Sequence, residues 1–561
     1  MRTAPIRWSS AVAAVLTVHS LAVFSQTRQD STTRTVMDSV RSIPDFEEIS
    51  DRWRDIVPPP SEYNVAGRWY DPYNQNIAKG DYPILGQNTF LVFALSVDNF
   101  GAVADVPTPS GVSALEQGSD AFFGRSDRFL VNEKVRLTLE LYHGDVAYRP
   151  RDWEVRITPV FDYNYTRLRE NNGVNVNVRK GSDRSDNHLG FQELSVEKHL
   201  FNVTDRYDFL SARAGIQRFS SDFRGFVFSD FNLGGRIFGS LDNNRVQFNA
   251  IVLPMLEKET NSELNTVFDD RGQTVAIANV YLHDYITSGY TSEFSFHYND
   301  DRASVHFDEN GFPVRPSIVG NTRPHAVQAL YAGWSGDGHL GRVNLTHTFY
   351  YAFGKDDFNS LAGRQIDIAA YMAALEISID RDWMRFALAG LYASGDDKPS
   401  DGTGGGFDSI IDEPFFAGGP FSYWFSQGIG LQAVGLVQKQ SFLPNLRSNK
   451  FEGQSNFVNP GLLLVNAEFT AEVTQELKGV LNVNFLRFDK TEVLVEFTHQ
   501  NSLHKNIGID FGAGVVYRPF LNNNAILAVG LTGLQPLDGW KDLYESSKLR
   551  IASFVSLILT Y

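Results

Sequence analysis

The chain of 561 residues contains no cysteine. Disulfide bridges, thiolate metal sites and covalent c-type haem attachment are therefore all excluded. Beyond the N-terminal stretch there is no apolar run of about 20 residues, the length that a membrane-spanning helix needs. An HExxH zinc motif, a GxSxG nucleophile motif, a phosphate-binding loop and a dinucleotide fingerprint are also absent. These absences leave no motif-defined enzyme class and no helical membrane protein.

The N-terminus has the three-part layout of a secretory signal peptide. Arg2 and Arg7 supply a short positive stretch, and residues 11–24 are mainly apolar. Compact residues precede Gln26, so we expect residues 1–25 to be removed. The apolar part is too short for a comfortable membrane span, which makes an uncleaved anchor the lesser alternative. No cysteine follows it, so a lipoprotein anchor is excluded, and the sequence predicts export.

Aromatic residues and an alternation of apolar with polar residues characterise the mature chain. Aromatic residues make up 13% of the sequence and charged residues 21%. The alternation recurs in residues 134–142, 290–298, 343–351, 507–517 and 549–561. A period of two places the two sets of side chains on opposite faces of a sheet. Segments of about ten residues are long enough to cross a bilayer as tilted strands.

The alternating segments favour a membrane barrel over a soluble sheet. Their second face is rich in glycine, asparagine, threonine and charge, which suits a wet lumen. Aromatic residues such as Tyr163, Tyr165 and Phe520 stand near strand ends, as in the girdles of membrane barrels. In lipid an open sheet edge is costly, so the sheet must close. We therefore predict an all-β fold, a transmembrane antiparallel β-barrel of about 16–18 strands in the cell outer membrane. A soluble β-sandwich or propeller is the alternative.

The mature chain divides into two unequal parts. Residues 26–85 are polar and contain the triplet Pro58-Pro59-Pro60, so we expect a short periplasmic extension or a plug that enters the lumen. A disordered leader is the alternative. Residues 86–561 are expected to form the barrel. Surface or constriction loops are expected in residues 101–127, 170–188, 254–273, 300–324 and 395–422.

An arginine-rich stretch supplies candidate lumen residues. If these side chains face the lumen, they form a positive constriction opposite two aspartates, and rings of charge set ion preference in a pore. The residues are Arg213, Arg218, Arg224, Arg236, Arg245, Asp222 and Asp230. The alternative is that they form salt bridges within the wall or lie exposed in loops.

A glycine-rich acidic stretch is a candidate calcium site, because clustered carboxylates supply the oxygen ligands that Ca²⁺ takes. Its residues are Asp396, Asp397, Asp401, Asp408 and Asp412. Their spacing does not match the EF-hand loop, so a solvated acidic loop is the alternative. No organic cofactor is expected.

Neither enzyme chemistry nor nucleic-acid binding has a clear signal. His283, Asp284 and Ser288 stand close in sequence, but without a motif's spacing they make a lipid hydrolase the weakest alternative. The formal net charge of −16 gives no basic footprint for nucleic acid.

The last strand resembles the C-terminal signal of bacterial outer-membrane barrels. It ends the chain on an aromatic residue, with Leu557, Leu559 and Tyr561 on one face. The resemblance implies that the outer-membrane insertion machinery reads this strand and that outer-membrane lipid surrounds the barrel.

Longer stretches resemble a family of largely uncharacterised outer-membrane porin-like proteins. They are residues 69–83, 217–238, 256–279, 459–464 and 517–524. The resemblance implies a barrel without assigned catalytic residues, and the strand number predicts passive passage of small hydrophilic solutes. Some related barrels sheath multihaem cytochromes. The alternative is therefore a sheath or receptor whose lumen is filled by a plug or by a separate cytochrome, because this chain has no CxxCH motif.

Overall fold

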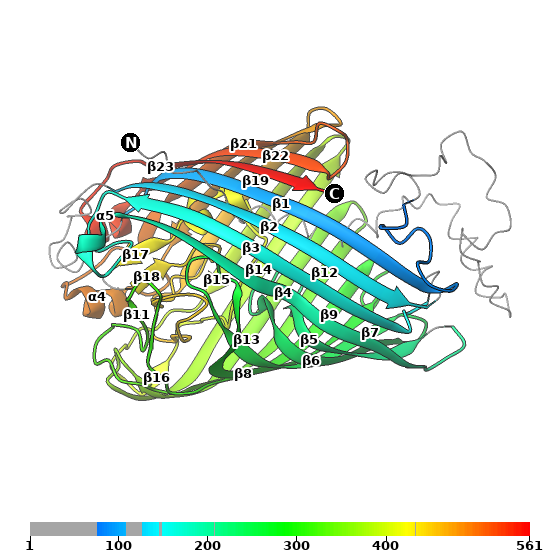
Figure 1. The fold of residues 1–561 in the computed structure, drawn as a ribbon. Helices are drawn as coiled ribbons and strands as arrows, with labels where there is room; N and C mark the ends of the chain where they lie inside the picture. The colour runs from blue at the N-terminus through cyan, green and yellow to red at the C-terminus, as the bar shows by residue number, and fades with distance from the viewer. Residues whose placement is uncertain (1–75, 108–125, 145–148, 207, 432–433) are drawn as a thin grey trace.

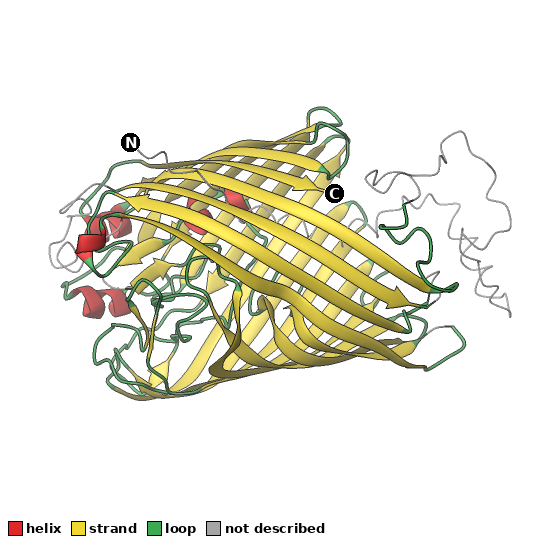
Figure 2. Cartoon of the chain, viewed as in Figure 1, coloured by secondary structure: helices red, strands yellow, loops and turns green. Residues whose placement is uncertain are grey.

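The computed structural model describes residues 76–107, 126–144, 149–206, 208–431 and 434–561. The predicted signal peptide and most of the predicted N-terminal extension lie outside these residues. Most of the described chain is strand, with a few short helices (Figure 2). Among the described residues, no helix combines the length and the apolar character needed to cross a membrane.

Long antiparallel strands form a closed barrel of 18 strands (Figure 1). The barrel closes where β1 pairs with β23, from Ser96 opposite Thr560 to Ala104 opposite Ala552. The wall consists of β1 (Thr89–Asp105), β2 (Asp127–His143), β3 (Trp153–Leu168), β4 (Asp183–Asn202), β5 (Phe209–Ser220), β6 (Ser229–Leu241), β7 (Val246–Lys258), β8 (Asn265–His283), β9 (Tyr290–Asp301), β12 (Val327–Leu340), β13 (Val343–Asn359), β14 (Arg364–Arg381), β15 (Met384–Ala393), β19 (Leu462–Glu472), β20 (Leu477–Arg487), β21 (Asn506–Tyr517), β22 (Ala525–Pro536) and β23 (Arg550–Thr560). The predicted fold class and strand number are confirmed.

The alternation of side chains along the strands explains the two faces of the wall. In β2, Lys134 and Glu140 are buried on the inner face, whereas the intervening Leu139 is exposed on the outer face. In β23, Arg550 is buried while Ile551 and Leu559 are exposed. Because side chains alternate across a strand, these strands present an apolar set to the membrane and their other set to the interior.

The connections at the two ends of the barrel differ in length. One end carries tight turns such as residues 341–342 and 382–383, whereas the other carries connections such as 302–326 and 394–461. Short turns are typical of the periplasmic end and long loops of the extracellular end. We therefore call these ends the periplasmic and extracellular rims. In Figure 1 the extracellular rim, with α4 (Glu492–Thr498) and α5 (Asp538–Tyr544), lies to the left.

The tip of the β5–β6 hairpin leaves the wall and turns into the lumen. Pairing of β5 with β4 stops at Ile216, and pairing of β6 with β7 stops at Gly235. The extracellular end of β4 instead lies against residues 259–264, which connect β7 to β8, where Asn261 donates a hydrogen bond to Asp186 (3.2 Å). The hairpin tip is therefore free to point inward.

The long connection from β15 to β19 also folds into the lumen. Residues 394–461 contain only short elements, and most residues from 407 to 459 are buried. The elements are β16 (Thr403–Gly404), η4 (Gly419–Phe421), α3 (Tyr423–Ser426), β17 (Ile429–Leu431) and β18 (Val434–Val437). The predicted surface or constriction loop at 395–422 is thus the first part of a longer inward segment.

Candidate functional site: the barrel lumen

Two inward segments join into one body, which we call the lumen plug and define as residues 394–461 together with 221–228. The backbone N–H of Ile410 donates to Val227 (3.1 Å), that of Ser229 to Ile411 (2.8 Å) and that of Glu413 to Gly225 (3.0 Å). The rings of Phe226 and Phe416 also meet edge to face, 5.4 Å apart. Because strand-like hydrogen bonds connect segments far apart in sequence, we expect them to move together.

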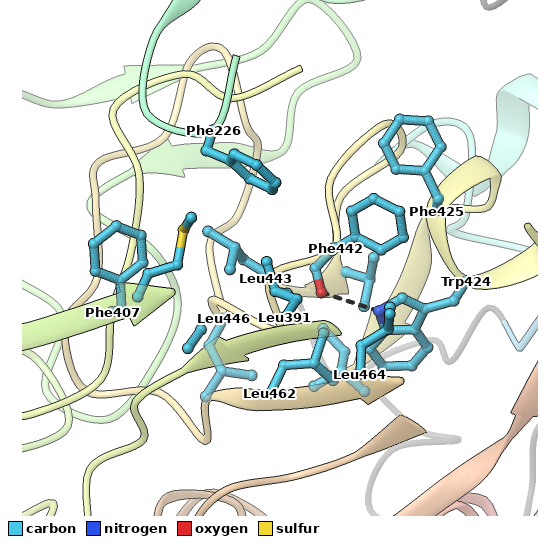
Figure 3. Packing of buried hydrophobic residues seen from close by; sticks show 14 of the residues in the cluster. Phe226, Leu391, Phe407, Trp424, Phe425, Phe442, Leu443, Leu446, Leu462 and Leu464 are labelled. Carbon is cyan, nitrogen blue, oxygen red and sulfur yellow. Dashed lines mark hydrogen bonds between the residues drawn. The ribbon is translucent and has the colours of Figure 1, made fainter. Parts of the chain in front are cut away.

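The lumen plug carries a hydrophobic core that packs directly on the wall. Figure 3 shows Trp424 of the plug beside Leu464 of the wall, with the indole N–H of Trp424 donating to the carbonyl of Phe442 (3.0 Å). Leu391 and Leu462 belong to the same cluster. Apolar inward residues on β15 and β19 fit an interior that excludes water here, because burial removes their surface from solvent.

A buried ion pair organises the plug from within. The guanidinium Nε of Arg447 lies 2.8 Å from Asp408 Oδ2, and both side chains are almost fully buried. Arg447 also donates to the carbonyls of Ile410 and Ser409 and to the hydroxyl of Ser455. Burial raises the pKa of the Asp408 carboxyl, and the Arg447 charge opposes that rise. The pair thus holds together turns that have no regular secondary structure.

Two further buried arginines hold the plug, one from the wall and one from β11 (Pro313–Arg315) in the β9–β12 connection. Arg271 of β8 donates to the carbonyls of Phe451 and Gly453, and Arg315 donates to that of Glu452 (2.6 Å). Neither arginine stands in a recognisable sequence motif, and the sequence analysis missed both, together with Arg447. A charged residue gives no local signal that its partner lies more than a hundred positions away.

The plug docks on β21 through glycine residues that face inward. Ser422 and the backbone N–H of Tyr423 both donate to the Asp510 carboxylate. A Cβ atom added at Gly512 would overlap the carbonyl of Phe421. The glycine-rich face of β21, interpreted from sequence as the lining of a wet lumen, is therefore a docking surface for the plug.

We expect Gly512→Val to dislodge the plug from β21, because the added side chain has no space beside Phe421. Overpacking of this kind costs typically about 1–3 kcal/mol. The measurement is single-channel conductance, which should rise or become noisy. Ala513→Val places the same side chain on the exposed outer face of the same strand and should leave the trace unchanged. Equal traces for both variants would contradict docking at β21.

The predicted constriction residues lie in three separate places. Arg218 and Arg224 approach Glu413 (3.9 Å) and Glu376 (2.8 Å) around the plug. Arg213 and Arg236 line the wall nearer the periplasmic rim, where Arg213 pairs with Glu197 and Arg236 donates to Asn249. The last arginine, Arg245, is exposed in a periplasmic turn.

The two aspartates of that prediction have structural partners. Asp222 accepts hydrogen bonds from the backbone of Arg224 (2.8 Å) and Gly225 (2.6 Å) and from the Tyr350 hydroxyl (2.9 Å), and burial raises its pKa. Asp230 pairs with Lys258 (2.7 Å). The structure therefore does not bring the arginines and aspartates together at one point, and their effect on ion preference stays a prediction.

A network of ion pairs lines the periplasmic half of the wall on β2 to β5. Arg156 lies 2.7 Å from Glu140, 3.0 Å from Glu154 and 3.4 Å from Glu193. Arg213 lies 3.9 Å from Glu154 and joins the network. The arginine side chains here keep 17–26% of their surface exposed, whereas Arg447 keeps 1%. Charges of both signs therefore face a part of the lumen that the plug leaves more open.

The five aspartates of the calcium prediction are not gathered at one point. Asp408 pairs with Arg447, and Asp412 accepts hydrogen bonds from Ser409 (2.8 Å) and Ser441 (2.6 Å). Asp396 and Asp401 accept backbone N–H groups of their own loop, and Asp397 approaches Lys490 (3.5 Å). In the described chain, groups of three possible metal ligands occur elsewhere: His325, Asp356 and Asp357, and Asp186, Glu259 and Glu309.

The second of these groups joins the extracellular end of β4 to two extracellular connections and is expected to respond to pH. Burial and the neighbouring Glu259 carboxylate raise the pKa of Glu309 to about 7. The folded state therefore binds this proton more tightly than the unfolded state does. The associated stabilisation is present at low pH and is lost as the pH rises through about 7.

We expect proteolysis within residues 302–326 to accelerate between about pH 5 and about pH 8, because ionised Glu309 is repelled by its neighbours. Cleavage is followed by mass spectrometry. Glu309→Gln should remove the pH dependence, whereas Glu476→Gln in a periplasmic turn should not change it. A cleavage rate in the unaltered protein that is independent of pH would contradict this coupling.

The predicted insertion signal lies on the outer face at the periplasmic rim. Leu557 and Leu559 face outward in β23, and the ring of Tyr561 lies 5.8 Å from Phe93 of β1. Lys79 sits 4.0 Å from the centroid of the Tyr561 ring. The chain end is therefore part of the barrel seam, and its recognition by insertion machinery stays a prediction.

The residues considered for a hydrolase lie at a periplasmic turn without catalytic geometry. His283 Nδ1 lies 3.0 Å from the Thr291 hydroxyl, and Asp284 accepts the backbone N–H of Gly289 (2.6 Å). The aspartate thus shapes the turn, and no contact joins His283 to Ser288 in the described structure.

Comparisons with known proteins give similarity of fold only. No family model matches the chain, and no curated protein matches it in sequence. Among solved structures, OccK9 (OpdG) of Pseudomonas aeruginosa is similar with a TM-score of 0.46 and 9% identity, over 84% of this chain and 98% of that one. OccAB4 of Acinetobacter baumannii is similar with a TM-score of 0.44 and 11% identity, over 85% of this chain and 99% of that one. The outer membrane protein OpdK of Pseudomonas aeruginosa is similar with a TM-score of 0.41 and 9% identity, over 84% of this chain and 98% of that one.

Proposed function

We propose that the chain is an outer-membrane channel through which small hydrophilic solutes pass, and that the lumen plug narrows the path. The observation that carries the proposal is the closed barrel of 18 strands, with apolar residues outside and polar residues inside. Barrels of about this size enclose an aqueous lumen unless something fills it. A soluble protein rarely exposes so large an apolar surface to water, so the apolar outer face of this wall favours a membrane location.

The charged wall of β2 to β5 is the part of the lumen best suited to solutes. Its arginines Arg156 and Arg213 keep part of their surface exposed, and each lies beside glutamates of its own or a neighbouring strand. A lining of both signs favours polar solutes over apolar ones without strong selection by charge. We propose that solutes cross the periplasmic half along this wall and pass the plug at its edge.

Recording from purified protein in planar bilayers tests the proposal. We expect discrete conductance steps that are small for a barrel of this strand number, because the plug occupies much of the lumen. Arg156→Gln, which removes one positive charge beside three glutamates of the wall, should shift the reversal potential towards cation preference. A folded barrel that gives no current steps under any voltage would overturn the simple channel.

A gated receptor is the second candidate, and the lumen plug favours it. A plug held by Arg271, Arg315 and Arg447 needs a signal to move, and a ligand at the extracellular loops would supply one by binding better to the displaced state. Current that appears only with an added solute would support this candidate. A sheath for a separate haem protein needs lumen space that residues of this chain occupy, so co-purification of such a partner is the test of that alternative.

A further inference from the structure

A pocket of about 350 Å³ opens on the wall where four strands reach the extracellular rim. It lies over β1, β2, β3 and β23, which include the barrel seam. Val103, Phe129 and Ile551 supply its apolar lining, and Val103 and Ile551 keep 51% and 47% of their surface exposed. These residues belong to the outward set of their strands, so the pocket faces the membrane rather than the lumen.

Two arginines lie at the edge of this pocket that is nearer the extracellular rim. Arg167 is exposed, its guanidinium lies 6.0 Å from the centroid of the Phe129 ring, and it makes no ion pair with a described residue. Arg169 approaches Asp127 at 3.6 Å, and both side chains are about half exposed. A long arginine side chain at this height can lie along apolar surface and place its charge at the membrane interface.

The acidic residues of the pocket are already neutralised. Asp105 is paired with Lys548 (2.5 Å) and with Arg550 (2.8 Å). Asp127 has Arg169 as its partner. Arg167 has Asp183 opposite it in the β3–β4 pairing but forms no ion pair with a described residue, so its guanidinium is available to a ligand.

We propose that this pocket binds the phosphate-bearing headgroup of a membrane lipid in the leaflet at the extracellular rim. Arginine guanidinium groups match phosphate geometry and can bind it through two hydrogen bonds. The acyl chains of the same lipid would continue over Val103, Phe129 and Ile551 towards the membrane interior. The inference rests on the proposed membrane location but not on conduction through the lumen.

Native mass spectrometry of the full chain in detergent micelles tests the site. The probes are phosphatidic acid and phosphatidylcholine with the same acyl chains. We expect the protein to retain phosphatidic acid more tightly than phosphatidylcholine. In the double variant R167Q/R169Q this preference should fall at least about tenfold, because each arginine near an anionic lipid adds to the attraction between them. The control is R364Q, which removes an exposed arginine at the start of β14, elsewhere on the same rim.

Equal retention of the two lipids by the unaltered protein would overturn the proposal, as would an equal loss in R364Q. Displacement of phosphatidic acid by millimolar inorganic phosphate would overturn the choice of a lipid and assign the site to free phosphate. Retention that appears only after residues 110–123 are deleted would mean that the chain itself fills the pocket. A barrel that retains phosphatidic acid but carries no current would overturn the channel and leave this site standing.

Discussion

Replacing residues 397–458 by an Asn-Gly turn is expected to raise the single-channel conductance of the barrel at least about threefold, since a barrel of this strand number leaves an aqueous lumen when nothing fills it. The ends of the deletion are chosen where the plug leaves the wall. The backbone N–H of Asp396 donates to the carbonyl of Asn459 (2.9 Å), so the two ends already lie as a hairpin pair does. A two-residue Asn-Gly turn matches the twist of such a pair.

The deletion removes the larger part of the lumen plug but none of the wall strands. The barrel should therefore still close through β1 and β23, which circular dichroism and resistance to unfolding in detergent would verify. The matched control shortens residues 171–180, another extracellular connection, which touches the β9–β12 connection through Val176 and Asn310. A folded deletion variant with unchanged conductance would contradict a plug that narrows the path.

Arg447→Met is expected to release the plug while the barrel stays intact. The substitution leaves the Asp408 carboxylate buried without its partner, and breaking a buried ion pair in this way costs about 3–5 kcal/mol. It also removes the hydrogen bonds to Ile410, Ser409 and Ser455. We expect rapid proteolysis within residues 394–461 and long-lived openings in bilayer recordings.

Two further variants make this result specific. Arg385→Met breaks an exposed pair with Asp380 near the periplasmic rim, where the expected cost is at most about 1 kcal/mol. Asp408→Asn combined with Arg447→Met removes the unpaired charge and should recover part of the protease resistance. If Arg447→Met resists proteolysis as well as Arg385→Met does, the pair does not hold the plug.

The barrel itself was predictable because its signals are local. A strand shows its two faces through alternation, as in Lys134 to Tyr142 of β2, and this pattern needs no knowledge of the neighbouring strands. The strand pattern therefore predicted the barrel class and the strand number, whereas the loop bounds were less well placed: the loop expected at 254–273 is only residues 259–264, between β7 and β8. The role of the arginines at 213–245 in a constriction stays a prediction.

What fills the lumen depended on contacts between distant residues. The glycines of β21 have the same pattern whether they face water or the carbonyl of Phe421. Trp424 lies in the four-residue helix α3 and Phe442 in an irregular stretch, and both are too short to show a periodicity, so nothing local predicts that they share a hydrophobic cluster with Leu464. The sequence alone determined a closed wall with a polar interior. The tertiary structure decided that this interior is partly occupied, because burial and ion pairing arise only when segments far apart in the chain meet.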